Sequence, residues 1–325
     1  MRQIVLEQPG TFRERSVEPP RQPGDEVLVR IRRVGVCGTD LHAFAGRQPF
    51  FSYPRVLGHE LGVEVIEAPP NRQGIGKGDK CAVEPYVNCG TCHACLRGKP
   101  NCCERLQVMG VHRDGGMQEL FSVPARLLHK SEKLTLDQLA LIETLGIGAH
   151  AVERSGLREG DEALIVGAGP IGLAVFSFAK LTGAKVRILE LQEDRRRFVE
   201  RLGAATLAEP DKQLADVVFD ATGNPQAMEA TFEYVAHGGR IVFVGLVQGR
   251  LSFDDSNFHR RETTLLSSRN SCGDFPRIIQ LIESGDLDTS PWITHRMELS
   301  EVPAKFAELR GYRDLVKAVI QVDSA

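Results

Sequence analysis

Two patterns of hydrophobic and polar residues divide the chain into halves. In the first half, Glu26–Arg32 alternate between apolar and polar side chains, and Leu61–Ile66 form a second extended run. Short strands joined by glycine and proline turns predict a barrel-like β domain there. From about residue 150, strand and helix patterns alternate at intervals of roughly 20 to 30 residues, which is typical of a parallel sheet with crossover helices.

The second half contains five segments that we expect to form strands. They are Glu162–Val166, Lys185–Leu189, Asp216–Asp220, Arg240–Val244 and Thr263–Ser267. After Gly285 this alternation ends, and the terminal segment Val316–Val322 has the apolar content of another strand. We therefore predict two domains, which are residues 1–148 with 286–325 returning to them, and residues 149–285.

Chain length and charge narrow the functional class. With 325 residues, of which 42% are hydrophobic, the chain is too long for one ordinary core and sufficient for two domains. Its net charge is -3, and lysine and arginine are interspersed with acidic residues, which argues against a nucleic-acid partner. The N-terminal apolar run is interrupted at Glu7, and no segment reaches the roughly 18 apolar residues of a membrane span. We expect a cytoplasmic protein without a membrane partner.

Four cysteines have the spacing of a structural zinc site. Cys89, Cys92, Cys95 and Cys103 form a C-x2-C-x2-C-x7-C pattern. Four thiolates fill a tetrahedral ion and leave no position for a substrate, so this zinc should stabilise the loop without taking part in catalysis. Disulfides are the weaker reading, because five of the eight cysteines lie between residues 89 and 103 of a long, charged chain. Cys81 and Cys272 have no motif around them and are expected to be buried thiols.

A glycine-rich motif predicts a dinucleotide site. Gly167, Gly169 and Gly172, with Pro170 and Ile171 between the last two, follow an expected strand and enter an apolar helical segment. The helix N-terminus would offer free N–H groups to a pyrophosphate.

Glu190 ends the next expected strand, where a carboxylate can hydrogen-bond the ribose hydroxyls. This favours NAD over NADP, because a 2′-phosphate about 4 Å from the carboxylate would cost up to about 4 kcal/mol at an effective dielectric constant of 20. Arg195, at the start of an arginine run, could instead neutralise such a phosphate.

A second metal site is predicted from three dispersed residues. Cys37, His59 and Glu60 would supply a thiolate, an imidazole and a carboxylate, and would leave a fourth position open, as a catalytic zinc requires. Glu143 is a competing carboxylate near the expected domain boundary. Sequence spacing does not rank Glu60 against Glu143.

Taken together, these motifs resemble the zinc-dependent medium-chain dehydrogenase/reductases over essentially the whole chain. The matching segments occur in the family's order: Gly35-x-Cys37-Gly-Thr-Asp-x-His42, Gly58-His-Glu60, the four-cysteine lobe, the glycine-rich motif, Asp220-Ala-Thr-Gly223 and Gly238-Gly-Arg-x-Val-x-x-Gly245. A Cys-His-Glu metal set is similar to that of polyol, threonine and sugar-acid dehydrogenases. Segments 53–59, 110–116 and 267–270 look closest to a bacterial branch of hexonate dehydrogenases and starvation-sensing proteins.

The resemblance implies an α/β fold with a GroES-like β-barrel-type catalytic domain and a Rossmann doubly wound parallel sheet. It implies hydride transfer between a secondary alcohol of a polyol or sugar acid and NAD, with two zinc ions per chain. Thr39 and His42 would form a proton relay, and the family's spacing selects Cys103 over Cys102 as the fourth thiolate. Weaker cofactor contacts are expected at Thr222, Gly223, Val244 and Arg269. The family also implies a homo-oligomer, either a dimer or a tetramer.

Two alternatives remain open from the sequence. One is a protein of this fold that binds NAD and zinc as a sensor without catalysis. The other is an enzyme for a simple alcohol or for threonine. Polar side chains near the expected cleft, namely Arg55, His112, Arg113 and His150, favour a hydrated and anionic substrate over a simple alcohol.

Overall fold

The computed structural model describes residues 1–21, 24, 26–49 and 51–322. The chain forms two compact units, Met1–Glu143 with Phe275–Ala325, and Thr144–Asp274. Their limits differ from the expected 148/149 and 285/286 boundaries at both edges. Helix α3 (Leu136–Ser155) runs without interruption through the first expected boundary, and helix α8 (Phe275–Ser284) belongs to the first unit.

The first unit is rich in short strands. Its strands are β1 (Arg2–Gln8), β2 (Thr11–Ser16), β3 (Glu26–Val36), β4 (Glu60–Glu67), β5 (Lys80–Val83), β6 (Tyr86–Val87), β7 (Gln107–Val108), β8 (Leu120–Pro124), β9 (Leu128–Lys130), β16 (Ile293–Glu298) and β17 (Lys317–Gln321). Its short helices are α1 (Gly38–Phe44), α2 (His93–Leu96), η1 (Pro100–Cys102), η2 (Ala125–Leu127), η3 (Leu299–Glu301), α9 (Val302–Lys305) and η4 (Phe306–Arg310).

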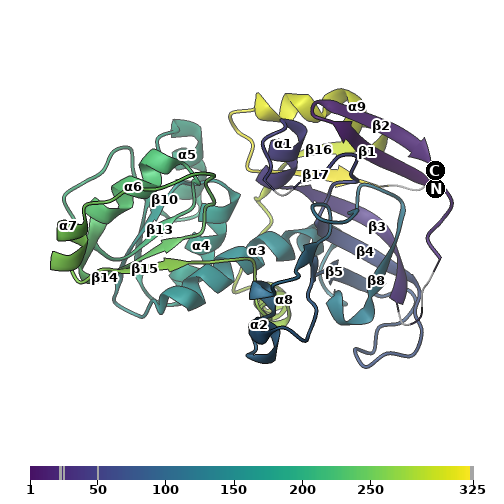
Figure 1. Cartoon of the computed structure of the whole chain (residues 1–325), viewed down its shortest axis with the longest axis horizontal. Coiled ribbons are helices and arrows are strands. Elements are labelled where there is room, and N and C mark those ends of the chain that lie inside the picture. Colours follow the sequence, from purple (N-terminus) through teal and green to yellow (C-terminus); the bar gives the residue numbers. More distant parts are fainter. Residues whose placement is uncertain (22–23, 25, 50, 323–325) are drawn as a thin grey trace. The chain divides into compact units, whose positions relative to one another are not determined.

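A seven-stranded sheet forms the centre of this unit. Its order is β16-β17-β3-β4-β5-β9, and β8 also pairs with β3. Strand β17 pairs antiparallel with β3, so the C-terminal strand lies in the sheet of the first unit. Figure 1 shows this juxtaposition as yellow C-terminal strands beside purple N-terminal ones.

Strand β3 illustrates how the sequence pattern builds this core. Val27, Val29 and Ile31 are fully buried and alternate with the half-buried Leu28 and Arg30, as expected for a strand with one face on the core. The register with β4 shifts between Leu28 and Val29 and again between Ile31 and Arg33. Such bulges re-aim the side chains that follow them, and β3 leads directly to the predicted metal ligand at residue 37.

An aromatic cluster holds α1 in place. The rings of Phe12, Phe44 and Phe306 pack with centroid separations of 5.0 to 5.4 Å. They come from β2, from the last turn of α1 and from η4, which are far apart in sequence. Buried aromatic clusters of this kind contribute through both apolar burial and ring geometry, so they fix the helix that begins at the predicted metal ligand.

Asp137, at the start of α3, is held by two arginines of the first unit. Its carboxylate accepts hydrogen bonds from Arg33 Nε at 2.8 Å and from Arg296 Nη2 at 2.6 Å. Burial alone would raise the pKa of Asp137, but these two arginines outweigh burial and lower it. The network therefore ties β3, α3 and β16 together.

The second unit is a parallel sheet with crossover helices. Its strands are β10 (Glu162–Val166), β11 (Lys185–Leu189), β12 (Ala205–Leu207), β13 (Ala215–Asp220), β14 (Val235–Phe243) and β15 (Thr264–Ser267). Its further helices are α4 (Pro170–Leu181), α5 (Glu193–Arg201), α6 (Pro225–Tyr234) and α7 (Asp255–Arg260).

The strand order is β12-β11-β10-β13-β14-β15, and every pairing is parallel. Because crossovers are right-handed, α4 after β10 and α6 after β13 cover opposite faces of the sheet (Figure 1). The fold is thus the predicted doubly wound one, with its switch of direction between β10 and β13.

The predicted strands agree closely with this sheet. Glu162–Val166 and Lys185–Leu189 match β10 and β11 at both ends. The prediction missed β12, and it began β14 at Arg240, whereas the strand starts at Val235. The glycines at 238 and 239 concealed the start of β14, because glycine within a strand marks an irregularity, and the register does shift in this strand pair. None of the helices in the described part of the chain has the length and apolar content of a transmembrane span.

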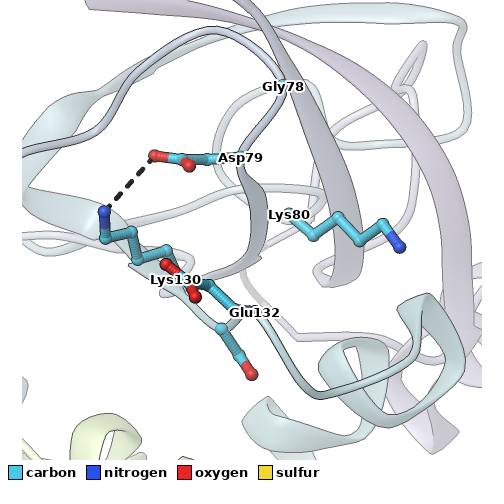
Figure 2. Close-up of a pocket in the computed structure, with 6 residues that line it drawn as sticks. Gly78, Asp79, Lys80, Lys130 and Glu132 are labelled. Carbon is cyan, nitrogen blue, oxygen red and sulfur yellow. Dashed lines mark ion pairs between the residues drawn. The ribbon is translucent and has the colours of Figure 1, made fainter.

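An open pocket of about 210 Å³ lies at the end of β5 and β9 in the first unit. Figure 2 shows Lys130 directed at Asp79, with an N–O distance of 3.7 Å, and Lys80 directed away from both. Its charged lining residues, Asp79, Lys80, Lys130 and Glu132, include both signs and do not converge on one point, so the pocket does not resemble a cofactor or metal site.

Candidate functional site

Cys37 occupies the turn between β3 and α1. It is the N-cap of α1, and its backbone N–H donates to Asp40 Oδ2 at 2.9 Å. Asp40 is fully buried, and its other oxygen lies 3.4 Å from the backbone N of Gly58, which precedes the His59-Glu60 pair. Asp40 therefore connects the two sequence segments that carry the predicted metal ligands.

Gly58 is required at this junction for two reasons. Its φ of +95° lies in the region that favours glycine, and a Cβ there would approach Val34 Cγ1 to 2.6 Å. The chain can therefore turn tightly and place His59 beside Asp40, with His59 Nδ1 3.8 Å from Asp40 Oδ1. His59 is only 5% exposed, and its Nδ1 has no hydrogen-bond partner among the described residues. Because Nδ1 faces Asp40 and the imidazole also has a hydrogen bond with the Cys37 side chain, the opposite ring nitrogen is the one suited to a metal ion beside that thiol.

Glu60 is the first residue of β4, and a lysine from another strand binds its carboxylate. It pairs with Gly35 of β3, and a Cβ on Gly35 would lie 2.1 Å from Glu60 Oε2, so the glycine makes room for the carboxylate. Lys317 Nζ donates to Glu60 Oε1 at 2.7 Å and to Oε2 at 2.8 Å. Both side chains are almost fully buried, with exposures of 1% and 2% for Glu60 and Lys317.

Glu143 lies in α3 and has a different partner. Its carboxylate accepts a hydrogen bond from the hydroxyl of Tyr86 in β6, and both residues are buried. Burial and then the charge of Glu143 raise the pKa of Tyr86 well above its ordinary value, so the hydroxyl remains a donor.

The site concentrates buried charge. Burial raises the pKa of Asp40 and of Glu143. Burial alone would lower the pKa of His59, but neighbouring negative groups, with Asp40 foremost, outweigh burial and raise it well above its ordinary value. Lys317 behaves in the same way, because Glu60 outweighs the effect of burial and raises the lysine pKa. A cation brought to this site therefore meets several acidic groups in a poorly solvated environment.

The structure groups Cys37, His59 and Glu60 together. Their ligand atoms all lie within 4.8 Å of one another, whereas Glu143 is not part of this set. A thiolate, an imidazole and a carboxylate are zinc donors, and three protein ligands leave a position for substrate. The chemistry and spacing of this donor set fit a catalytic zinc. Sequence spacing alone had not ranked the two glutamates.

Thr39 and His42 follow Cys37 in the sequence and lie three residues apart on one face of α1. Thr39 is half-buried, and His42 is exposed. Desolvation, followed by the charges of Arg47 and Arg310, lowers the pKa of His42. The imidazole is therefore uncharged at neutral pH and able to accept a proton.

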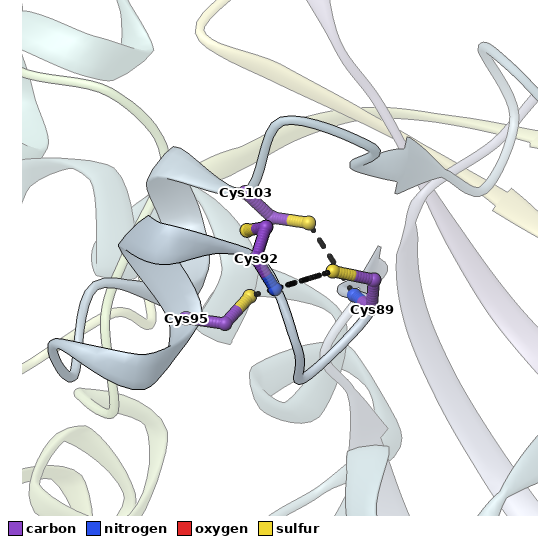
Figure 3. A group of neighbouring side chains, drawn as sticks. All are labelled: Cys89, Cys92, Cys95 and Cys103. Atoms are coloured by element: carbon purple, nitrogen blue, oxygen red, sulfur yellow. Dashed lines mark hydrogen bonds between the residues drawn. The ribbon is translucent and has the colours of Figure 1, made fainter.

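The four cysteines of the loop converge as Figure 3 shows. Their sulfur atoms lie within 4.8 Å of one another, and Cys89 Sγ is 4.0 Å from Cys95 Sγ. Backbone N–H groups also point at the sulfurs, for example Cys92 N at 3.3 Å from Cys89 Sγ. The neighbouring Arg105 and the backbone of Thr91 lower the pKa of Cys89 to about 5, which favours a thiolate.

This donor set fits a tetrahedral zinc with no open position. Cys102 is exposed and is not in the group. Cys81 is fully buried as expected, whereas Cys272 is only half-buried, so the expectation of a buried thiol was wrong there.

In the second unit, the glycine-rich loop joins β10 to α4. Gly167 has a φ of +99°, and Gly169 is the N-cap of α4, followed by Pro170 at the first helical position and Ile171. A Cβ on Gly172 would lie 1.9 Å from the carbonyl oxygen of Gly167, so this glycine allows the helix to pack on the loop. A Cβ on Gly169 would meet no atom within 4 Å, so the space beside it is open. The helix start thus presents N–H groups to an accessible region, which suits a phosphate.

Glu190 lies beside this loop. Its Oε2 accepts from Ala168 N and its Oε1 from Gln192 N, each at 2.8 Å. The carboxylate is therefore fixed next to the glycine-rich turn, with lone pairs left for a ribose hydroxyl. Arg195 lies in the first turn of α5, five residues after Glu190, and is half-buried.

The weaker cofactor candidates lie after neighbouring strands. Thr222 and Gly223 follow β13, where Asp220 accepts from the Thr222 hydroxyl and from Gly223 N. Val244 follows β14 and donates its N–H to Asp220 O at 2.9 Å, and Arg269 follows β15. Because carboxyl ends of parallel strands share one edge of a sheet, these residues lie on the same edge as the glycine-rich loop.

Of the polar residues expected near a cleft, His112 and Arg55 form local contacts. His112 Nδ1 accepts from Val108 N at 3.1 Å, within a turn. Arg55 forms an ion pair with Asp114 at 3.4 Å, and Arg113 is exposed. His150 lies in α3 within the second unit, and burial lowers its pKa. Their geometry gives no specific support for an anion site.

Three residues of the site were missed by sequence reasoning. Asp40 stands within a quoted motif, three residues after an N-cap, and that capping spacing could have identified it. Lys317 interrupts an apolar strand, and a lysine in such a run signals a buried ion pair. Tyr86 carried no comparable signal.

Comparisons with known proteins agree with this geometry. Residues 23–133 match the family described as alcohol dehydrogenase GroES-like domain, and residues 170–284 match the family described as zinc-binding dehydrogenase. The chain is 39% identical to L-galactonate-5-dehydrogenase of Escherichia coli K12, with 98% of each chain covered. It is 33% identical to 2-dehydro-3-deoxy-L-galactonate 5-dehydrogenase of Pseudoalteromonas atlantica, with 92% of each covered.

Among solved structures, the rspB alcohol dehydrogenase of Escherichia coli CFT073, complexed with the cofactor NADH, superposes with a TM-score of 0.92. The two chains are 28% identical, and 99% of each is covered.

Proposed function

The chain belongs to the zinc-binding dehydrogenases with an alcohol dehydrogenase GroES-like domain, and on that premise we propose that it transfers a hydride between NAD and a secondary alcohol of a sugar acid. It is an oxidoreductase. The observation that carries the proposal is the set of Cys37, His59 and Glu60, because three zinc donors with an open fourth position are what alcohol activation requires.

Zinc bound there would supply Lewis-acid chemistry, lowering the pKa of the substrate hydroxyl. Thr39 would accept the hydroxyl proton through its own hydroxyl and pass it towards His42. The uncharged His42 imidazole, which is exposed, can release the proton to solvent. Asp40 would hold His59 and the Cys37 turn in register throughout.

The second unit would bind the dinucleotide. The N–H groups at the start of α4 would hold the pyrophosphate, and the open space beside Gly169 would let it approach. Glu190 would accept from the adenosine ribose and disfavour a 2′-phosphate, so NAD is the proposed cofactor. One structural relative is complexed with NADH and another, from Sinorhizobium meliloti, is bound to NADP, so the choice of NAD rests on Glu190.

We propose a six-carbon sugar acid, oxidised at C5, as the substrate. Support comes from the two relatives whose names specify a 5-dehydrogenase acting on a galactonate or a deoxygalactonate. The simple-alcohol and threonine alternatives would use the same metal chemistry, so a substrate panel must separate them.

Zinc content and turnover test this proposal together. The native protein should contain two zinc ions, and Cys37→Ser should contain one and lose NAD reduction with a panel of hexonates. Cys102→Ser is the matched control, because this exposed thiol is outside both donor sets and should leave two zinc ions and full turnover. One zinc in every variant with no turnover on hexonates, simple alcohols or threonine would refute the enzyme assignment and favour a non-catalytic sensor.

A further inference from the structure

Lys317 is a buried cation bound to a predicted metal ligand. Its Nζ has three oxygens within reach, Glu60 Oε1 at 2.7 Å, Glu60 Oε2 at 2.8 Å and Val36 O at 3.4 Å. An ammonium group has three donors, so it can donate to each of these oxygens. We propose that Lys317 is a positioning residue that neutralises Glu60 in the metal-free site and competes with the metal for that carboxylate. This inference rests on the metal site proposed above.

Strand register places the lysine where it can act in this way. In the pairing of β17 with β3, Ala318 lies opposite Val36 and Val319 opposite Gly35. Gly35 in turn lies opposite Glu60 in the pairing of β3 with β4. The lysine therefore reaches the carboxylate from a strand neighbouring the one that leads to Cys37, and central sheet pairings hold it there.

The surrounding charges explain why a cation is needed before metal binds. Asp40 and Glu60 are both buried, and the charge of Glu60 acts on Asp40. Cys37 and Glu143 act electrostatically on Lys317. A buried carboxylate without a counter-charge is strongly unfavourable. Lys317 supplies this counter-charge and holds the Glu60 carboxylate in place beside Cys37 and His59.

The same contact weakens metal binding. Both oxygens of Glu60 already receive a donor from Lys317, so a metal ligated by Glu60 shares that carboxylate with a neighbouring positive charge. Glu60 is then a ligand that can be partly released. A purely structural ion pair differs, because its loss would lower the stability of the metal-free and metal-loaded forms alike without changing metal affinity.

The test compares zinc release from the native protein with release from four variants. Lys317→Met removes the positive charge at similar length, and Lys317→Arg retains it. Glu60→Gln removes the negative charge, and Lys317→Met/Glu60→Gln removes both charges, so the four proteins with and without each charge form a double-mutant cycle. Chelator is titrated against zinc-loaded protein, and the zinc lost from the Cys37 site is counted separately from the four-cysteine zinc by subtracting the Cys37→Ser result. Thermal unfolding is measured for the metal-free and zinc-loaded forms.

For Lys317→Met we expect that the chelator concentration needed to remove the Cys37-site zinc rises on the order of tenfold. Its metal-free form should melt at a lower temperature than the native metal-free protein, while the zinc-loaded forms should differ less. Lys317→Arg should return both values towards native. The effect of Lys317→Met should shrink when Glu60 is already glutamine, since the competition acts through that carboxylate.

Unchanged or weakened zinc binding in Lys317→Met would overturn the proposal. If this variant does not fold, Lys317→Gln, which can still donate to Glu60, provides the same comparison. Two zinc ions in native protein with no shift in the lysine variants would refute this inference alone. A native protein with only the four-cysteine zinc would contradict the proposed function as well.

Discussion

Replacing Gly172 with alanine should destabilise the second unit, although it removes no polar or charged group. The new Cβ would lie 1.9 Å from the carbonyl oxygen of Gly167, about 1.5 Å short of ordinary van der Waals contact. That oxygen belongs to the backbone and cannot rotate away, and Gly167 itself is held at a φ of +99°. The steric overlap can therefore be relieved only if α4 moves away from the sheet.

The expected magnitude combines two opposing effects. Overpacking costs about 1–3 kcal/mol and occasionally more, and this overlap places the cost at or above the upper end. Alanine in a helix gains about 1 kcal/mol over glycine. A net loss of about 2–3 kcal/mol follows, which corresponds to a fall in melting temperature of about 4–12 °C for a domain of this size.

Gly169→Ala is the matched control. A Cβ at this position meets no atom within 4 Å and the residue has a φ of -71°, so stability should change by less than about 0.5 kcal/mol. The same methyl group would enter the space proposed for the pyrophosphate, so NAD binding should weaken at least about tenfold.

Calorimetric unfolding and NAD titration by fluorescence would separate the two effects. A native-like melting temperature for Gly172→Ala would show that the packing argument is wrong. Unchanged NAD affinity in Gly169→Ala would refute the assignment of this loop to the pyrophosphate.

Three further changes test other parts of the molecule. Asp137→Asn should lower the free energy of unfolding by about 0.5–1 kcal/mol at pH 7. Because the pKa of Asp137 is lowered in the folded state, its stabilising contribution is present above the unfolded-state pKa and is lost as the pH falls through the folded-state pKa. The free energies of unfolding of native and variant protein should therefore converge in acid. Phe306→Ala, at a side chain only 1% exposed, should cost about 3–5 kcal/mol by chemical denaturation, whereas Tyr312→Ala, at 42% exposure, should cost less than about 1 kcal/mol. Equal losses would contradict the role of the aromatic cluster. Cys103→Ser should lose one zinc by elemental analysis and melt earlier, while Cys102→Ser keeps both ions; the reverse result would reassign the fourth thiolate.

Much of this protein could be predicted from local patterns. Five of the six strands of the parallel sheet were located because each is a short apolar run bounded by turn residues. The shortest strand, Ala205–Leu207, was missed because three residues carry too little periodicity. The expected domain boundary at 148/149 lies inside the helix Leu136–Ser155, because helical periodicity does not reveal which core each turn of a helix packs against.

The sequence by itself determined the two local sites. The four cysteines lie within 15 residues, and the glycine-rich turn occupies six, so chain geometry nearly dictates which atoms meet. Only the tertiary structure placed Glu60, and not Glu143, with Cys37 and His59, and brought Lys317 to Glu60 across 257 positions. The physical reason is strand register: a shift of one residue turns a side chain to the other face, and long-range packing, not local pattern, sets that register.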